Sequence, residues 1–274
     1  MTGVGEVSSV YLASAREAGL LGHLAGEPYV SGFYREPVAN EPQILVEYAS
    51  ARILGDAQLM DELRSGLVEE HPEAQRILLR VPSGHAPAAE GWFPYLSYVQ
   101  LGHRTEPGND DLVRHAETSE EPLVRAWLAD ALRTACEQQG RLLASGAALD
   151  TAQQILDAPD RESLVFVHEG RAVGHLTLRT DSYEEVLGQE RVEMVDALTD
   201  DAPDPRQAQR RLVKAAARRA QELGRPLVAN VVHTASSNDA DSHGRRIIGK
   251  LRDQGWSVIY EFWSLKLSGP LEGA

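Results

Sequence analysis

The sequence predicts an α/β fold in which short β-strands alternate with amphipathic helices. Three observations support this prediction. Apolar, β-branched and aromatic runs recur along the 274-residue chain, as in strands. Other segments place apolar residues on one helical face, as Leu59, Leu63 and Leu67 do. A Glu169-Gly170 pair between two strand-like runs predicts a β-hairpin.

The first part of the chain contains fewer clear elements than the rest. We expect strands at 44–54 and 76–81 and a helix at 57–71. Residues 91–101 are expected to form one strand or two strands broken at Pro94. The polar segment 104–121 is typical of a linker. The small, polar ends 1–10 and 268–274 are expected to be disordered.

The second part of the chain has a denser pattern of elements. Helices are expected at 122–138, 148–157, 206–223 and 243–255, a hairpin at 163–178, and strands at 191–198, 225–232 and 256–267, the last being two strands or one bent strand. Gly224 follows the third of these helices, where a glycine commonly ends a helix.

The two parts are predicted to be distant copies of one unit. Each contains a strand with a glutamate (Glu47, Glu193), a helix, a strand, and a Gly-Trp pair before an aromatic strand. The first copy is predicted to lack the hairpin and the helix before its Gly-Trp pair. We therefore expect a truncated unit at 1–110 and a complete one at 111–274.

Composition excludes several classes of protein. Hydrophobic residues make up 42% of the chain, and no apolar run is long enough to span a bilayer. Cys136 is the only cysteine, so an internal disulfide and a cysteine zinc site are excluded. His168 and His175 are expected to be ordinary strand residues, not zinc ligands. The N-terminus lacks the features of a secretory signal, and a cytoplasmic location is expected.

The charge is unevenly distributed. The chain has a net charge of -14, which argues against a general basic surface for nucleic acid. Residues 205–252 nevertheless hold eleven Lys and Arg against three acids. This basic segment favours a specific anionic ligand, and a merely solvated helix surface is the alternative.

Residues 120–267 resemble the GNAT acyltransferase superfamily in the order of their elements. The resemblance rests on VFVHEGRAVGHLTL for the second and third strands, VEMVDAL for the fourth, and QRRLVKAAARRAQELGRPLVANVV for the next helix and strand. It implies a mixed, mostly antiparallel sheet flanked by helices, present here as two GNAT-like units. It also implies transfer of an acyl group from a thioester to an amine.

The resemblance places the donor, acetyl-CoA or another acyl-CoA, where the fourth and fifth strands diverge. The main-chain amides of Val195 to Leu198, Ala197 included, would polarise the thioester carbonyl. The start of the following helix would hold the pyrophosphate. The family's Arg/Gln-x-x-Gly-x-Gly/Ala pattern falls with its glycine positions on Gln207 and Gln209. Three arginines could compensate by ionic contact: Arg206, Arg210 and Arg211.

Candidate catalytic residues follow from the same resemblance. Glu193 is the candidate base, and Asp196 replaces it if a bulge changes the side-chain alternation. The family's usual tyrosine acid is missing from 236–251, so His243 is the candidate acid. His233 and Asn238 follow the fifth strand, where the donor's arm would lie. Trp256, Tyr260, Phe262 and Trp263 are expected to pack between the units or to line a substrate pocket.

The sequence thus favours an N-acyltransferase acting on a small-molecule amine. Two alternatives stay open: a transferase that takes an aminoacyl group from aminoacyl-tRNA, and a GNAT-like binding protein without activity. Nucleic acid is an expected partner only if tRNA is the donor, and no membrane partner is expected. A homodimer through an exposed terminal strand is a further expectation.

Overall fold

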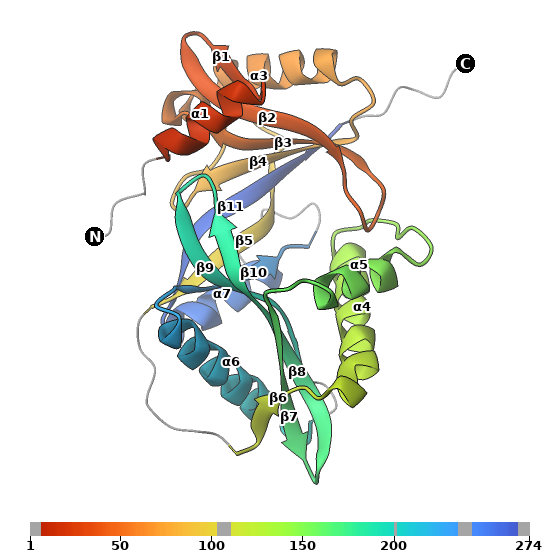
Figure 1. Ribbon diagram of the computed structural model, residues 1–274. Helices are drawn as coiled ribbons and strands as arrows, with labels where there is room; N and C mark the ends of the chain where they lie inside the picture. Colours follow the sequence, from red (N-terminus) through yellow and green to blue (C-terminus); the bar gives the residue numbers. More distant parts are fainter. Residues whose placement is uncertain (1–6, 103–110, 200–201, 235–242, 268–274) are drawn as a thin grey trace.

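The computed structural model describes residues 7–102, 111–199, 202–234 and 243–267. Its strands form one eleven-stranded sheet in the order β1-β2-β3-β4-β11-β5-β10-β9-β8-β7-β6 (Figure 1). Only the pairs β3–β4 and β9–β10 are parallel within this described sheet. The predicted α/β class and the mixed, mostly antiparallel sheet are therefore confirmed. None of the helices in these ranges combines the length and apolar character that a bilayer crossing requires.

The first half of the molecule, residues 7–102, holds five strands and three helices. In order they are α1 (Ser9–Glu17), β1 (Leu21–Leu24), β2 (Glu27–Arg35), β3 (Pro42–Ala49), α2 (Ala51–Gly55), α3 (Ala57–Glu70), β4 (Arg76–Pro82) and β5 (Phe93–Leu101). The expected strand at 44–54 is wrong beyond Ala49. Ser50 caps a short helix there, since its side chain accepts a hydrogen bond from the Ile53 amide at 3.3 Å.

The prediction that the first copy lacks a hairpin is wrong. β1 and β2 form an antiparallel hairpin closed by Ala25 and Gly26, whose φ angles are +50° and +81°. Ala25 adopts this left-handed conformation without being glycine or asparagine, so the usual turn signal is weak. The expected disordered N-terminal tail is also too long, because α1 already begins at Ser9. Residues 1–6 and 268–274 lie outside the described residues.

The second half, residues 111–267, follows the predicted order closely. Its elements are β6 (Val113–His115), the 3₁₀ turn Thr118–Glu120, α4 (Glu121–Gln138), α5 (Ala147–Leu156), β7 (Arg161–His168), β8 (Arg171–Glu184), β9 (Gln189–Leu198), α6 (Pro205–Glu222), β10 (Leu227–Val232), α7 (His243–Asp253) and β11 (Trp256–Lys266). The Glu169-Gly170 hairpin is confirmed, with φ angles of +49° and +77°. The expected linker 104–121 is interrupted by β6, whereas 103–110 lie outside the described residues.

The two halves exchange their last strands. β11 of the second half pairs with β4 on one side and β5 on the other. β5 of the first half lies between β11 and β10. Figure 1 shows β5 and β11 in the centre of the molecule, with the first half at the top and the second below. Because β11 is paired on both sides, it is not the exposed strand that the dimer expectation assumed.

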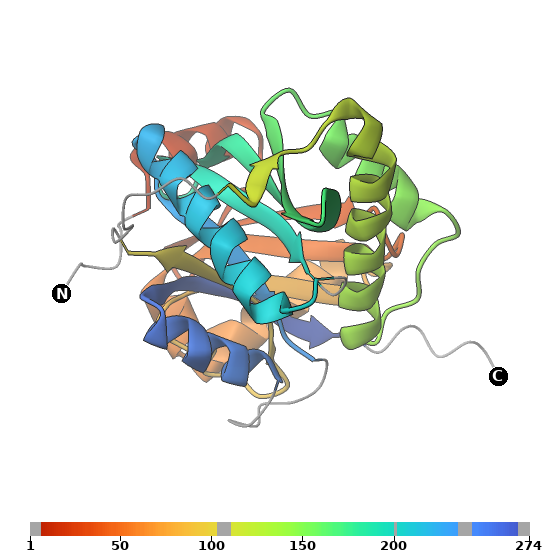
Figure 2. The ribbon, with the colours of Figure 1, turned by 90° about the horizontal axis from the view of Figure 1, so that it is seen from below.

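One face of the sheet is apolar in both halves. In the first half Ile44, Ile77 and Leu79 form a core with Leu63 of α3. In the second half a similar core lies under α6 and includes residues from α7. Its fully buried members include Leu176, Leu178, Val192 and Leu212. Helices α4 and α6 flank the β7–β9 strands on opposite sides (Figure 2).

The other face of the sheet carries polar side chains that join the halves. Arg141, which follows α4, donates hydrogen bonds to Tyr95 (2.7 Å) and Glu41 (3.1 Å) and also pairs with Glu36. Its side chain is only 5% exposed. Removing one member of such a buried ionic group leaves uncompensated charge, so this group resists separation of the halves.

Candidate active site between the two halves

Both halves contain the same break in their parallel strand pair. The β3–β4 ladder ends at Val46 and Leu79, and the β9–β10 ladder ends at Met194 and Ala229. All four strands continue past these pairs, so each strand pair opens. Beside each opening the strand has a one-residue bulge, Glu47 in β3 and Val195 in β9. The repeated bulge supports the predicted internal duplication.

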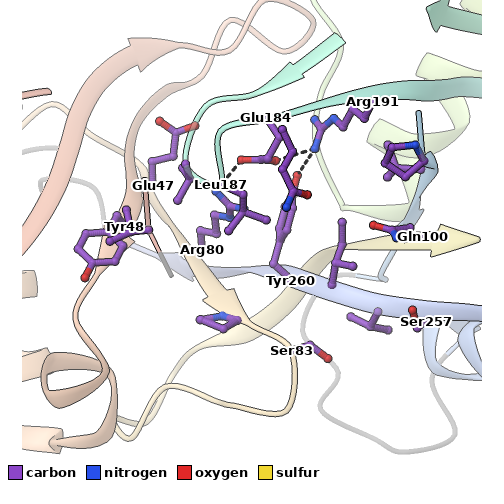
Figure 3. Close-up of a pocket in the computed structure, with 18 of the residues that line it drawn as sticks. Glu47, Tyr48, Arg80, Ser83, Gln100, Glu184, Leu187, Arg191, Ser257 and Tyr260 are labelled. Carbon is purple, nitrogen blue, oxygen red and sulfur yellow. Dashed lines mark hydrogen bonds and ion pairs between the residues drawn. The ribbon is translucent and has the colours of Figure 1, made fainter. Parts of the chain in front are cut away.

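A pocket of about 520 Å³ lies at the opening of the first half (Figure 3). The ends of β3 and β4 contribute Glu47, Tyr48 and Arg80. The exchanged strand β11 contributes Tyr260, and the β8–β9 turn of the second half closes another side with Leu187. The pocket is therefore built by both halves and has the size of a small-molecule site.

An ionic bridge crosses this pocket. The carboxylate of Glu184 accepts hydrogen bonds from Arg80 of the first half (2.8 Å) and Arg191 of the second (2.6 Å). Arg191 also donates to the Tyr260 hydroxyl oxygen at 3.0 Å, and the Arg80 guanidinium lies 3.9 Å from the Tyr260 ring centroid. Glu184, Arg80 and Arg191 are all buried. The bridge holds this wall of the pocket in place, and both arginines are engaged in ion pairs with Glu184.

Glu47 has the environment of a general base. Its carboxylate accepts a hydrogen bond from the Tyr11 hydroxyl at 2.9 Å and has no ion-pair partner among the described residues. Burial raises the pKa of the Glu47 carboxyl, and the nearby Glu184 and Glu185 raise it further against the opposing effects of Tyr11 and Arg80. A carboxylate with a raised pKa in a pocket accepts a proton more readily than an exposed one.

Tyr260 can supply a proton to the same pocket. Burial raises the pKa of its phenol, so the hydroxyl stays protonated. Arg191 occupies the hydroxyl oxygen as a donor, and no acceptor for the Tyr260 hydroxyl hydrogen is found in the described ranges. The sequence predicted that Tyr260 packs between the units or lines a pocket; it does both.

The two predicted base candidates lie on β9, outside the pocket. Glu193 accepts a hydrogen bond from Ser182 at 3.1 Å and lies 3.6 Å from Arg191. The bulge at Val195 places Asp196 on the same face as Glu193, since their partners on β8, Thr177 and Arg179, are two residues apart. Of the predicted catalytic and donor-binding residues that the structure describes, none lines the pocket.

Asp196 has a buried histidine behind it. Its Oδ2 lies 3.3 Å from Nε2 of His175, which is fully buried. The ring of Trp127 from α4 stacks on the His175 ring, with centroids 5.2 Å apart. The opening of the second half is thus covered on this side by packed side chains, and Asp196 is its partly exposed acid. His175 is therefore a strand residue, as predicted, with an ionisable partner that the sequence did not indicate.

The helix start expected to bind phosphate is already capped, and so is the corresponding helix start in the first half. In the second half Asp204 accepts a hydrogen bond from the Gln207 amide at 3.0 Å. In the first half Asp56 accepts from the Gln58 and Leu59 amides at 2.9 and 3.2 Å. A carboxylate therefore stands in each half where a pyrophosphate would bind. With these caps in place, the diphosphate of coenzyme A would have to compete with an aspartate carboxylate for the amides at either helix start.

The remaining predicted residues that the structure describes lie on β9, α6 and α7, outside the pocket. Ala197 and Leu198 pair with β8 on one edge of β9. Arg206, Gln207, Gln209 and Arg210 are exposed on α6, Arg211 is half-buried, and Arg210 donates to the Arg206 carbonyl at 3.2 Å. His243 is the exposed first residue of α7. Asn238 lies outside the described residues.

A sequence signal in the first half was missed. Arg52, Gly55 and Ala57 fit the Arg-x-x-Gly-x-Ala form of the family's phosphate pattern, and they follow β3 directly. No atom of the described chain lies within 4 Å of the position that a Cβ on Gly55 would take. This glycine leaves open space beside the chain, which a close approach by a ligand requires.

His233 lies in the interior of the second half, where it takes part in a hydrogen-bond network. It is 1% exposed, and its Nε2 donates a 2.8 Å hydrogen bond to Ser97, whose hydroxyl donates to Glu261 at 2.7 Å. Burial and the nearby Arg245 lower the pKa of His233 to about 4. A Cβ on Gly244 would stand 2.5 Å from the His233 ring, so α7 packs directly against it. This network joins the exchanged strands β5 and β11 to α7.

Comparison with solved structures identifies the fold. A GCN5-related N-acetyltransferase from Sphaerobacter thermophilus superimposes with a TM-score of 0.51 at 12% identity, covering 87% of this chain and 76% of that one. A GNAT-family acetyltransferase from Colwellia psychrerythraea gives a TM-score of 0.50 at 6% identity, covering 90% and 84%. No protein-family profile and no curated protein sequence matches the chain. The chain therefore has the GNAT fold, as the resemblance implied.

Proposed function

We propose that this protein is an acyltransferase that moves an acyl group from a thioester to a small-molecule amine, and that the pocket between the halves is its active site. One observation carries the proposal. Glu47, a carboxyl with a raised pKa and no ion-pair partner in the described chain, stands on the bulge of an opened strand pair and lines a pocket of about 520 Å³. This combination is what proton removal from an ammonium group requires.

The pocket residues have distinct roles in this proposal. Glu47 takes the proton from the acceptor's ammonium group, and the freed nitrogen lone pair attacks the thioester carbon. Main-chain amides on the open edge of β3 polarise the carbonyl oxygen during the attack. When the carbon–sulfur bond breaks, the Tyr260 hydroxyl donates its proton to the leaving thiolate. Arg191, which donates to the Tyr260 oxygen, stabilises the phenolate that remains.

Acetyl-CoA or another acyl-CoA is the donor that the fold favours. Its thioester arm suits the open strand edges, and Arg52 and Gly55 follow directly on β3. Its diphosphate has to displace the Asp56 carboxylate from the Gln58 and Leu59 amides. The energetic cost of this displacement predicts weak coenzyme A binding by the protein and tighter binding by Asp56→Asn, which removes the negative charge and keeps a capping side chain.

Aminoacyl-tRNA is the second candidate donor. The exposed cations of α6 and α7 favour it: Arg206, Arg210, Arg246, Lys250 and Arg252. The overall net charge of -14 opposes a long polyanion, so binding would depend on this one surface and would fall steeply with salt. A GNAT-like binding protein without turnover is the third candidate.

The experiment is an acyl-transfer assay with acetyl-CoA and a panel of amines, run on the protein, on Glu47→Gln and on Tyr260→Phe. Turnover that falls at least 100-fold in Glu47→Gln and at least tenfold in Tyr260→Phe supports the proposal. Turnover that survives Glu47→Gln overturns the assigned site. Transfer from aminoacyl-tRNA but not from acetyl-CoA selects the second donor. Amine binding without turnover from either donor selects the binding protein.

A further inference from the structure

We infer that the pocket takes an amine with an apolar body and no carboxylate group. The inference rests on the proposed function, because it names the substrate class of the same site. It follows from the charges at the pocket and from the apolar side chains in its lining.

The charged groups at the pocket favour a cation. Glu47, Glu184, Arg80 and Arg191 line it, and Glu193 contacts Arg191 from behind. Exposed Glu185 also acts electrostatically on Glu47. The two lining carboxylates balance the two lining arginines, and Glu193 and Glu185 add negative charge close to the pocket. A ligand carboxylate would therefore be repelled, whereas an ammonium group would be attracted.

The two arginines already have hydrogen-bond partners in the protein. Arg80 and Arg191 both donate to Glu184, and Arg191 also donates to Tyr260. An amino acid's carboxylate would have to compete with Glu184 for these arginines inside a buried ionic bridge. The site therefore selects against amino acids even though it attracts their amino group.

Glu47 offers the anchoring oxygen for the amine. Its Oε2 accepts the Tyr11 hydrogen bond, and its Oε1 has no hydrogen-bond partner among the described residues. An ammonium group that donates to Oε1 would pair with the one lining carboxylate not already bound to an arginine. The nitrogen would then lie beside the base that deprotonates it.

The second half also contributes apolar side chains to the pocket lining. They are Val186 and Leu187 of the β8–β9 turn, with Pro226, Val228 and Val258. Burying an apolar ligand body against these side chains adds affinity in proportion to the area covered. The acceptor that fits has an amine at one end and an alkyl or aryl group at the other.

The test is calorimetric titration without any acyl donor. The probes are 2-phenylethylamine, phenylalanine, which adds the carboxylate, 2-phenylethanol, which lacks the charge, and ethylamine, which lacks the apolar body. We expect 2-phenylethylamine to bind at least tenfold more tightly than each of the other three. Equal or tighter binding of phenylalanine, or no measurable binding of 2-phenylethylamine, overturns the inference.

Two variants locate the binding. Glu47→Gln should remove the preference for 2-phenylethylamine over 2-phenylethanol, and its glutamine oxygen can still accept the Tyr11 hydrogen bond. Glu222→Gln, the matched change at an exposed α6 acid that does not line the pocket, should alter affinity less than twofold. An unchanged affinity in Glu47→Gln contradicts the inference. Because no thioester is present, amine binding and acyl transfer can fail separately, so the two proposals remain distinguishable.

Discussion

The two halves share a backbone arrangement and differ in what fills it. Each has an opened parallel pair, a bulge beside the opening and a helix capped by an aspartate. At the bulges the first half has Glu47 followed by Tyr48, and the second has Val195 followed by Asp196. The first opening is a pocket, whereas α4 and Trp127 pack beside the second. Repetition of a backbone therefore does not repeat its chemistry.

The difference arises from the covering elements. The second half has α4 and α5 over the sheet face opposite α6, and Val195 and Leu198 join their apolar cluster. In the first half, α1 and the β8–β9 turn of the second half lie at the opening. The half with fewer elements consequently keeps the cavity. The second half contributes to this cavity Tyr260, from the exchanged strand β11, and Glu184, the centre of the ionic bridge.

The largest expected effect is on activity, and it compares a substitution at the first opening with one at the second. Glu47→Gln should lower kcat for acyl transfer by 100- to 10,000-fold, because it removes the proton acceptor. Asp196→Asn should lower kcat less than threefold. Both are measured at saturating donor and amine. The reverse order would move the active site to the second half, with His175 as the residue that orients Asp196.

Breaking the ionic bridge between the halves should have the next largest effect, on the stability of the protein. Glu184→Gln leaves Arg80 and Arg191 without their shared carboxylate and should cost about 4 kcal/mol of unfolding free energy in urea. Glu222→Gln, in an α6 acid whose side chain is 53% exposed, should cost less than about 1 kcal/mol. Fluorescence and circular dichroism should report one coincident transition. Two separated transitions would contradict the shared sheet.

The buried network of the second half should make stability depend on pH. His233 has a pKa of about 4 in the folded protein against 6.5 for the free side chain. Below pH 6.5 the unfolded chain binds the proton more readily, so stability falls as pH drops from 6.5 toward 4, by about 3 kcal/mol at most. His233→Gln should flatten this part of the stability curve. An equal slope in the variant would assign the loss to other groups.

Two glycines in α7 should respond in opposite directions. Gly244→Ala places a methyl group 2.5 Å from the His233 ring and should cost about 1–3 kcal/mol. Gly249→Ala, where no described atom lies within 4 Å of the new carbon, should gain about 0.5–1 kcal/mol from helix propensity. Thermal unfolding of both variants measures the contrast. Similar shifts in both would mean that α7 does not pack tightly on His233.

Prediction from the sequence succeeded where the signals were local. The Glu169-Gly170 hairpin and helix 206–223 depend on turn chemistry and apolar periodicity within a few residues, and both formed as expected. The first-half hairpin was missed because its turn begins with Ala25, a residue that rarely takes positive φ. The helix at 51–55 was missed because its apolar residues continue those of the strand before it.

The candidate site could be predicted only in part. Sequence spacing led to β9 and to the acids Glu193 and Asp196, and it anticipated that a bulge would matter. It did not indicate Glu47 as a base, because the raised pKa depends on burial and on Glu184, 137 positions away in the chain. The Arg52, Gly55 and Ala57 pattern was present in the sequence and could have been found.

The sequence by itself determined the class of fold, the order of most elements and the likeness of the two halves, because periodicity and turn residues act over short distances. Only the tertiary structure decided that the last strands are exchanged and that the cavity lies in the less complete half. Those outcomes depend on β11 packing between β4 and β5. Pairing between strands that are far apart in the chain is set by the whole sheet, so local sequence patterns do not predict it.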